Sequence, residues 1–153
     1  MAEPRVGVLI GSTSDREVMA RCLEQLEALG IPAELLVLSA HRTPEAVREY
    51  ARSAEKRGIR VLVAGAGMAA HLAGALASAA LLPVIGVPLE SGPLRGMDAL
   101  LATVQMPRGV PVACMAIGEA GAANAALFAA QILALEDSEL RRRLEKLREA
   151  WRG

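Results

Sequence analysis

The chain has 153 residues, and its 17 Lys and Arg residues balance 17 Asp and Glu residues, giving a formal net charge of zero. Aromatic residues are scarce, at one Trp, one Tyr and one Phe. Both features argue against a nucleic-acid partner, because such proteins usually carry a basic patch and often stacking aromatics. The length predicts a single domain over residues 1–153 that buries its own core.

Strand and helix patterns alternate along a predicted core from residue 5 to residue 135. Apolar runs predict strands at 5–10, 33–38, 60–64, 84–87 and 110–115. Helical spacing of apolar residues, bounded by Gly or Pro, predicts helices at 15–29, 44–57, 68–80 and 122–135, and one within 94–104. This alternation is typical of a doubly wound α/β sandwich with a parallel sheet. Five strands fit the flavodoxin-like order 2-1-3-4-5.

Residues 61–89 contain no Asp, Glu, Lys or Arg and are long enough for a membrane span. Glycines and prolines interrupt the stretch and His71 lies within it, so buried strand, loop, helix and strand is the better interpretation. We therefore expect no membrane partner. The start of the chain does not resemble a signal peptide, and Cys22 and Cys114 lack metal-type spacing. These features predict a cytoplasmic protein with reduced thiols.

The end of the chain differs from the core. Residues 138–151 are rich in charge, and Leu140, Leu144, Leu147 and Trp151 recur at i, i+4, i+7 and i+11. This spacing predicts a C-terminal amphipathic helix whose apolar stripe must be buried. The stripe packs either on its own domain or on a neighbouring subunit, and the sequence leaves both alternatives open.

Two short loops, GSTSD at 11–15 and SAHRTP at 39–44, each follow a predicted strand and open a predicted helix. The first offers hydroxyls and free backbone N–H groups, which suit a phosphate, although a cap formed by Ser14 or Asp15 explains it equally well. Asp15 also suits sugar hydroxyls. The second loop places His41, a proton carrier, beside Arg42, a fixed cation that matches oxyanions. Thr43 is its predicted helix cap.

A third motif, GAGMAAH at 65–71, imitates the dinucleotide fingerprint G-x-G-x-x-G/A, and Glu90 follows about 20 residues later. The fingerprint normally belongs to the first strand–helix unit, whereas this motif lies in the third. A Gly-rich turn also serves any ligand that contacts backbone N–H groups, including a carboxylate. No His, Asp or Glu cluster has metal-ligand spacing, so no metal site is predicted.

The motifs together resemble the N5-carboxyaminoimidazole ribonucleotide mutase family, the catalytic-subunit type of phosphoribosylaminoimidazole carboxylase in purine biosynthesis. The resemblance runs from about residue 6 to residue 135. It rests on GSTSD, SAHRTP, GAGMAAHLAG, VIGVPLESGPLRGMDALLATVQMPRGVPV and AIGEAGAANAALFAAQIL, in the family's order and spacing. The chain departs from the common family pattern at Arg16, Met68 and Ala73, where Trp, Gly and Pro are usual.

The resemblance implies an enzyme that moves a carboxylate from the exocyclic nitrogen of the ribonucleotide to carbon 4 of its imidazole. It implies two catalytic residues, His41 as general acid/base and His71. The substrate-binding candidates, which hold the ribose phosphate or close over the base, are Ser12, Ser14, Asp15, Ser39, Arg42, Gly65, Ala66, Gly67 and Leu72.

The resemblance further implies a homo-octamer with its sites at subunit junctions, no cofactor, and functional pairing with an ATP-dependent synthase that supplies the substrate. Two alternatives stay open: direct carboxylation of aminoimidazole ribonucleotide by carbon dioxide, and a non-catalytic flavodoxin-like module that binds a flavin or nucleotide. A dehydrogenase built on the 65–70 motif is the least favoured interpretation.

Overall fold

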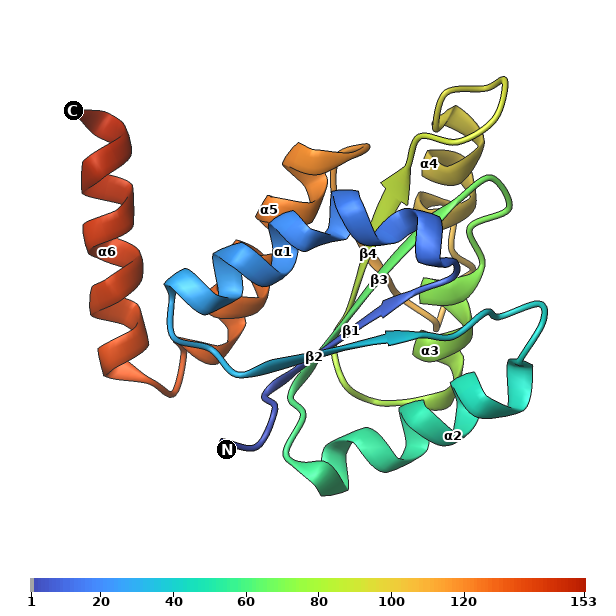
Figure 1. Ribbon diagram of the computed structural model, residues 1–153. Coiled ribbons are helices and arrows are strands. Elements are labelled where there is room, and N and C mark those ends of the chain that lie inside the picture. The colour runs from blue at the N-terminus through green and yellow to red at the C-terminus, as the bar shows by residue number, and fades with distance from the viewer. Residues whose placement is uncertain (1) are drawn as a thin grey trace.

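The computed structural model describes residues 2–153, which form an all-parallel five-stranded sheet covered by helices on both faces (Figure 1). The strand order is β2-β1-β3-β4-β5, so the predicted flavodoxin-like arrangement is confirmed. The strands are β1 (Val6–Ile10), β2 (Ala33–Val37), β3 (Val61–Gly67), β4 (Val84–Leu89) and β5 (Ala113–Cys114).

Helices fill the connections between the strands, as right-handed crossovers in a parallel sheet require. They are η1 (Thr13–Asp15), α1 (Arg16–Ala28), α2 (Pro44–Ala54), η2 (Glu55–Arg57), α3 (Leu72–Ala79), α4 (Met97–Val104), α5 (Glu119–Leu133) and α6 (Ser138–Arg152). Helices α1 and α5 cover one face of the sheet, while α2, α3 and α4 cover the other (Figure 1). The carboxyl ends of β1 to β4 therefore open at one common edge.

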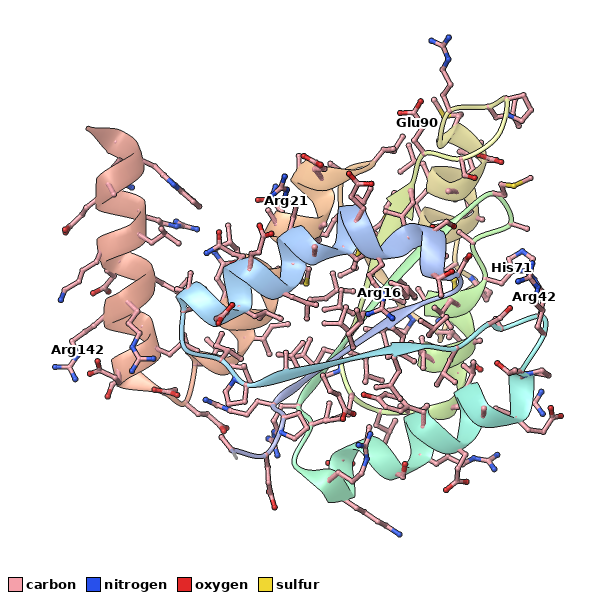
Figure 2. The ribbon with its side chains drawn as sticks, in the orientation of Figure 1. Arg16, Arg21, Arg42, His71, Glu90 and Arg142 are labelled. Carbon is pink, nitrogen blue, oxygen red and sulfur yellow. The ribbon has the colours of Figure 1, made fainter. Side chains whose placement is uncertain are left out.

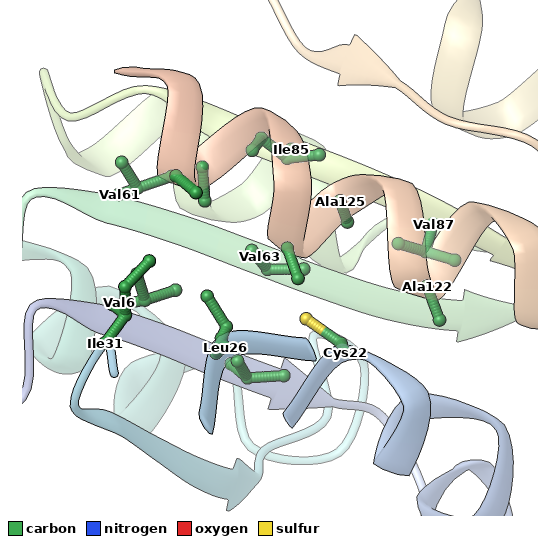
Figure 3. Packing of buried hydrophobic residues seen from close by; sticks show 14 of the residues in the cluster. Val6, Cys22, Leu26, Ile31, Val61, Val63, Ile85, Val87, Ala122 and Ala125 are labelled. Carbon is green, nitrogen blue, oxygen red and sulfur yellow. The ribbon is translucent and has the colours of Figure 1, made fainter. Parts of the chain in front are cut away.

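The core under α1 and α5 is built from branched residues of the strands and small residues of α5. Ala122 and Ala125 are fully buried beside Val63 of β3 and Cys22 of α1 (Figure 3). Because alanine has no side chain beyond Cβ, the two helices approach each other and the sheet closely. Each fully buried Leu, Ile or Val contributes about 1.5–3 kcal/mol relative to exposure, so this layer anchors the strands that carry the site.

A cluster of polar side chains fixes α2 against β2, which is an edge strand of the sheet. The Tyr50 hydroxyl donates a hydrogen bond of 2.7 Å to Glu34 of β2, and Arg57 pairs with the same carboxylate at 2.9 Å. The Arg57 guanidinium also lies 4.8 Å from the centroid of the Tyr50 ring. Burial, with the carboxylate beside it, raises the pKa of Tyr50 well above its usual value. The cluster fixes the position of α2 relative to β2, and with it the position of the loop that joins them.

The largest difference from the predicted elements lies in the glycine-rich segment. Residues 65–67 continue β3, because Gly65, Ala66 and Gly67 pair with the last three residues of β4. Helix α3 then begins at Leu72, so residues 68–71 are a loop rather than the predicted first turn of a helix. The glycines are extended and paired within the sheet, which is not the tight strand-to-helix turn of a dinucleotide fingerprint.

Smaller differences concern the ends of the chain's later elements. Strand β5 has only two residues, Ala113 and Cys114, where six were predicted, because the residues before it do not pair with β4. Helix α5 begins at Glu119, three residues before the predicted start. Arg16 is exposed on α1, as expected for a tolerated substitution, and Ala73 is buried in α3.

Helix α6 follows α5 in the chain and lies at the side of the domain, away from the sheet (Figure 1). Its stripe is divided: Leu140 is buried against α5, whereas Trp151 is 60% exposed. Asp137 caps the helix by accepting from the Leu140 amide at 3.0 Å and pairs with Arg5 at 2.9 Å. The predicted helix is confirmed, and its own domain buries Leu140 fully and Leu144 and Leu147 in part, leaving Trp151 exposed. Within residues 2–153, no helix combines the length and apolarity needed to cross a membrane.

Candidate active site

A cavity of about 290 Å³ opens at the carboxyl ends of the strands, between the loops that follow β1, β2 and β3. This is the point where the chain's path reverses, since β1 lies between β2 and β3 in the sheet. Open α/β sheets bind ligands at such a switch point, because adjacent loops diverge there and leave a crevice. Figure 2 shows His71 and Arg42 together at this edge of the sheet.

Nearly all the residues predicted from the sequence line this cavity. They are Ser12, Ser14, Asp15, Ser39, His41, Arg42, Ala66, Gly67, His71 and Leu72. They come from three separate segments of the chain, which the parallel sheet brings to one edge.

Gly65 is the exception among the predicted substrate-binding residues. It is buried within β3, outside the cavity lining, and a Cβ atom at this position would lie 2.6 Å from Sδ of Met19. Its carbonyl accepts a hydrogen bond from the Gly11 amide at 3.4 Å. Gly65 therefore has a packing role beneath the site, because β3 continues to Gly67, three residues beyond the predicted end of the strand at residue 64.

The first loop is organised by Ser12. Its hydroxyl oxygen accepts from the Ser14 hydroxyl at 3.0 Å and from the Ser14 amide at 3.4 Å, so Ser12 caps η1. The predicted cap from Ser14 or Asp15 was wrong: Asp15 occupies the cap position of α1 without a side-chain bond. Because the bonds formed here use the Ser12 oxygen as an acceptor, its own O–H can donate to a phosphate oxygen.

The second loop is a tight turn that presents Arg42. The Ser39 hydroxyl accepts from the Arg42 amide at 3.1 Å, and the Thr43 hydroxyl bridges the amide and carbonyl of Ser39 at 3.1 Å each. Thr43 is the first residue before α2, as predicted, but its hydroxyl closes this turn and does not cap the helix. The turn fixes the backbone so that the exposed Arg42 guanidinium lies at the cavity.

The two histidines contact each other across the cavity. Nε2 of His41 lies 2.7 Å from Nδ1 of His71, and the rings meet edge to face with centroids 4.7 Å apart. One nitrogen must donate and the other must accept, so the bond requires a defined pair of tautomers. Both residues are exposed, which leaves their remaining nitrogens accessible to a ligand or to water.

Asp15 is the carboxylate that lines the cavity. Partial burial raises the pKa of Asp15 above its usual value, and hydrogen bonding with the Ser12 backbone offsets part of that effect. A half-buried carboxylate beside a cationic site favours hydrogen-bond donors such as sugar hydroxyls as partners. Among residues 2–153, no group of three or more His, Cys, Asp or Glu side chains is placed to hold a metal ion.

The sequence interpretation missed some residues of the lining. Ser91 follows β4 and lines the cavity, and Gly11, Ala40 and Ala69 complete the backbone wall. Ser91 stood in a motif that carried the family resemblance but received no role. Its position directly after a buried strand was the available signal, since β4 ends at the same edge as β1 and β3.

The family comparison agrees with this geometry. The family model described as AIR carboxylase matches residues 5–152. The chain belongs to the AIR carboxylase family. The expectation that it is an enzyme of this family, drawn from five short motifs, is confirmed over almost its whole length.

Several curated relatives in the family carry the name N5-carboxyaminoimidazole ribonucleotide mutase. The Bacillus subtilis protein is 55% identical over 96% of this chain and 91% of its own length. The Escherichia coli K12 protein is 53% identical over 95% of this chain and 86% of its own length. The Saccharolobus solfataricus protein is 54% identical over 98% of this chain and 94% of its own length.

A solved structure supports the same fold. The crystal structure of Treponema denticola PurE superimposes with a TM-score of 0.87 at 28% identity, covering 96% of this chain and 90% of that one. The relatives place this family member among mutases of purine biosynthesis, and the roles of individual residues are argued below from the geometry of the cavity.

Proposed function

We propose that this chain is an N5-carboxyaminoimidazole ribonucleotide mutase, with His41 as its general acid/base. The observation that carries the proposal is the His41–His71 pair, 2.7 Å apart, in a cavity that also presents Arg42 and several serine hydroxyls. This arrangement combines a group able to move a proton with donors suited to a phosphate. Relatives 53–55% identical to the chain carry the name of the mutase.

The polar loops hold the sugar phosphate. The Ser12 and Ser39 hydroxyl oxygens both accept hydrogen bonds inside their own loops, so their O–H groups stay available to donate to a phosphate oxygen. The Arg42 guanidinium adds a bidentate cation for the phosphate oxygens. Asp15 accepts from the ribose hydroxyls. These contacts fix the nucleotide at one end and leave the base near the β3–α3 loop and the histidines.

The reaction then uses one residue twice. The substrate's N-carboxylate is a labile carbamate, and protonated His41 delivers a proton to the exocyclic nitrogen as the C–N bond breaks and carbon dioxide leaves. The freed aminoimidazole is electron-rich at carbon 4, which attacks the trapped carbon dioxide and forms the new C–C bond. His41 then removes the proton from carbon 4, which restores the aromatic ring and the charge on His41. Atoms and protons balance without an external acid.

Two features of the site support this use of His41. The bond to His71 orients the imidazole, so the same ring nitrogen is presented in both proton transfers. Retention of carbon dioxide beside the ring supplies the proximity that a two-step exchange needs. The loop at residues 68–71 and the backbone of Ala66 and Gly67 form the wall next to the base.

We also propose that the enzyme is a cytoplasmic homo-octamer with sites at subunit junctions, as the family resemblance implies. The exposed histidines and the exposed Trp151 end of α6 support burial by other copies. Because the carbamate substrate is labile, functional pairing with an ATP-dependent synthase keeps it from decomposing in solution. Sedimentation of the purified protein tests the assembly, and a monomer under assay conditions contradicts it.

The primary test mixes the purified protein with N5-carboxyaminoimidazole ribonucleotide, without ATP or added bicarbonate, and follows the carbon-carboxylated isomer. We expect rapid conversion by the wild type. His41→Gln retains a hydrogen-bonding atom near the position of Nε2 but cannot carry the proton, so conversion falls by about 10²–10⁴-fold while binding of ribose 5-phosphate persists. Normal turnover by His41→Gln rules out the acid/base role.

One other function is favoured by a specific observation, since the matched family model is described as AIR carboxylase. In that case the same cavity carboxylates aminoimidazole ribonucleotide with free carbon dioxide. The same assay separates the two: product from aminoimidazole ribonucleotide plus bicarbonate, with none from the N-carboxylated compound, establishes the carboxylase.

A further inference from the structure

Met68 combines two unfavourable properties at the edge of the cavity. Its φ of +52° lies in the left-handed region, which only Met68 and Arg95 adopt among the non-glycine residues in the described part of the chain. Its large apolar side chain is also 51% exposed. Backbone strain and exposed apolar surface each destabilise a fold, and strained residues cluster where a ligand is held.

The side chain has a defined position despite its exposure. A Cβ atom at position 92 would lie 3.6 Å from Cε of Met68, so the thioether lies over Gly92 at van der Waals distance. Next to this contact, a Cβ atom at position 67 would lie 2.9 Å from Cβ of Ser91. The end of β3 and the start of the β3–α3 loop are therefore packed directly against the loop after β4, and Met68 lies where these segments meet.

The cavity is divided chemically, and Met68 lies on its apolar side. The side chains of Ser12, Ser39 and Arg42 supply donors where the β1 and β2 loops meet. Beyond β3 most of the lining is apolar, made by Ala66, Ala69, Leu72 and Met68 with the backbone of Gly67, and His71 and Ser91 are its polar members. Within residues 2–153, no Phe, Tyr or Trp lines the cavity, so the Met68 thioether offers an apolar, polarisable surface to a planar ring.

We propose that Met68 is a specificity-determining residue whose side chain forms the apolar wall against which the planar base of the nucleotide lies. The inference rests on the proposed function, which places the sugar phosphate at the polar end. A thioether against an aromatic ring is a favourable contact, and the ligand then covers surface that is otherwise left in water. The left-handed backbone is retained because it places the side chain over Gly92 and beside the base.

The test compares two probes by isothermal titration calorimetry: aminoimidazole ribonucleotide, which has the base, and ribose 5-phosphate, which lacks it. The ratio of their dissociation constants measures what the base contributes. We expect Met68→Ala to weaken nucleotide binding about five- to tenfold and to leave ribose 5-phosphate within about twofold. Met68→Leu keeps an apolar wall, so its ratio of the two dissociation constants stays close to that of the wild type.

Two further variants separate the side chain from the backbone. Met68→Gly removes the wall and relieves the positive φ, so it shows the same loss of nucleotide affinity together with an unfolding temperature no lower than that of the wild type. Leu81→Ala, at a fully exposed apolar residue in the α3–β4 connection outside the cavity, leaves both dissociation constants unchanged.

Several outcomes overturn the inference. Equal weakening of both probes by Met68→Ala means that Met68 only shapes the loops, and unchanged binding of both means that it does not contact the base. Equal affinity of the wild type for the two probes means that the base makes no contribution. Failure of the wild type to bind either probe overturns the proposed function itself, and with it this inference.

Discussion

The His41 and His71 rings lie in direct contact, with 2.7 Å between Nε2 of one and Nδ1 of the other, although 30 positions separate them in the chain. His41 comes from the loop after β2, and His71 comes from the loop after β3. Strand β1 lies between those strands in the sheet, so the loops meet only by reaching across its carboxyl end. The contact between the two histidines therefore depends on the positions of all three strands, β2, β1 and β3.

Loss of His71 is expected to affect the rate of reaction more than binding. His71→Ala removes the partner that orients His41, so kcat falls about 10- to 100-fold while KM changes little, and the pH–rate profile moves with it. His71→Asn places an amide near the position of Nδ1 and retains more of the rate. Steady-state kinetics from pH 5 to pH 9 make the comparison. Equal kinetics for the Ala and Asn variants contradict a role that depends on this hydrogen bond.

Asp15→Asn is expected to stabilise the protein at neutral pH and to weaken substrate binding. The native pKa of Asp15 is raised by partial burial, so the native state holds this proton more tightly than the unfolded chain does. The ionised carboxylate therefore costs stability once the pH rises through the native pKa, and it costs nothing below the unfolded value of 3.8.

Urea unfolding of wild type and Asp15→Asn from pH 3 to pH 8 measures this effect. The variant is more stable at pH 7, and the difference narrows as the pH falls toward 3. A constant difference across the range means that burial of charge at Asp15 is not its cause.

Gly65→Ala is expected to reduce stability and leave ligand affinity unchanged. The added Cβ meets the Met19 side chain at 2.6 Å beneath the site, an overpacking that costs about 1–3 kcal/mol. In the Met19→Ala background the new methyl group enters vacated space, so the double variant is less destabilised than the sum of the single variants. Unfolding and ribose 5-phosphate titration test this. A selective loss of affinity would instead return Gly65 to the binding site.

Arg42→Ala is expected to weaken binding of ribose 5-phosphate about 10- to 100-fold, since a hydrogen bond to a charged partner contributes about 1.5–3 kcal/mol. Arg42→Lys keeps the charge but loses the planar fork, and it recovers part of the affinity. Arg48→Ala is the matched control, because Arg48 is exposed on α2, the helix that follows the Arg42 loop, and does not line the cavity. Similar losses for Arg42→Ala and Arg48→Ala would indicate general electrostatic attraction only.

The architecture could be predicted from the sequence because the periodicity of apolar residues, and the Gly and Pro residues that end each element, can be recognised within short stretches of the chain. Buried strands read as apolar runs, helices as i, i+3, i+4 spacing, and Gly or Pro marks their ends. Their strict alternation leaves few topologies, so the strand order was predictable. Most predicted site residues were also predictable, because polar side chains directly after buried strands collect at one edge of a parallel sheet.

The glycine-rich segment shows where this reasoning failed. Local pattern suggested a turn at Gly65, but pairing with Val87 to Leu89 of β4 extends the strand to Gly67 and displaces the loop to residues 68–71. Strand extension depends on partner residues that lie 22 positions later in the chain, and the residues around Gly65 do not contain that information. Met68, with its left-handed backbone, is the first residue after the strand ends at Gly67.

The sequence by itself determined the order of strands and helices, the loops that carry the polar residues, and the family to which they are similar. Only the tertiary structure decided that His41 contacts His71, that Gly65 packs on Met19 below the cavity, and that Met68 lies over Gly92. The physical reason is range: propensity and hydrophobic period act over neighbouring residues, whereas these contacts join segments that only the packed sheet brings within a few ångströms.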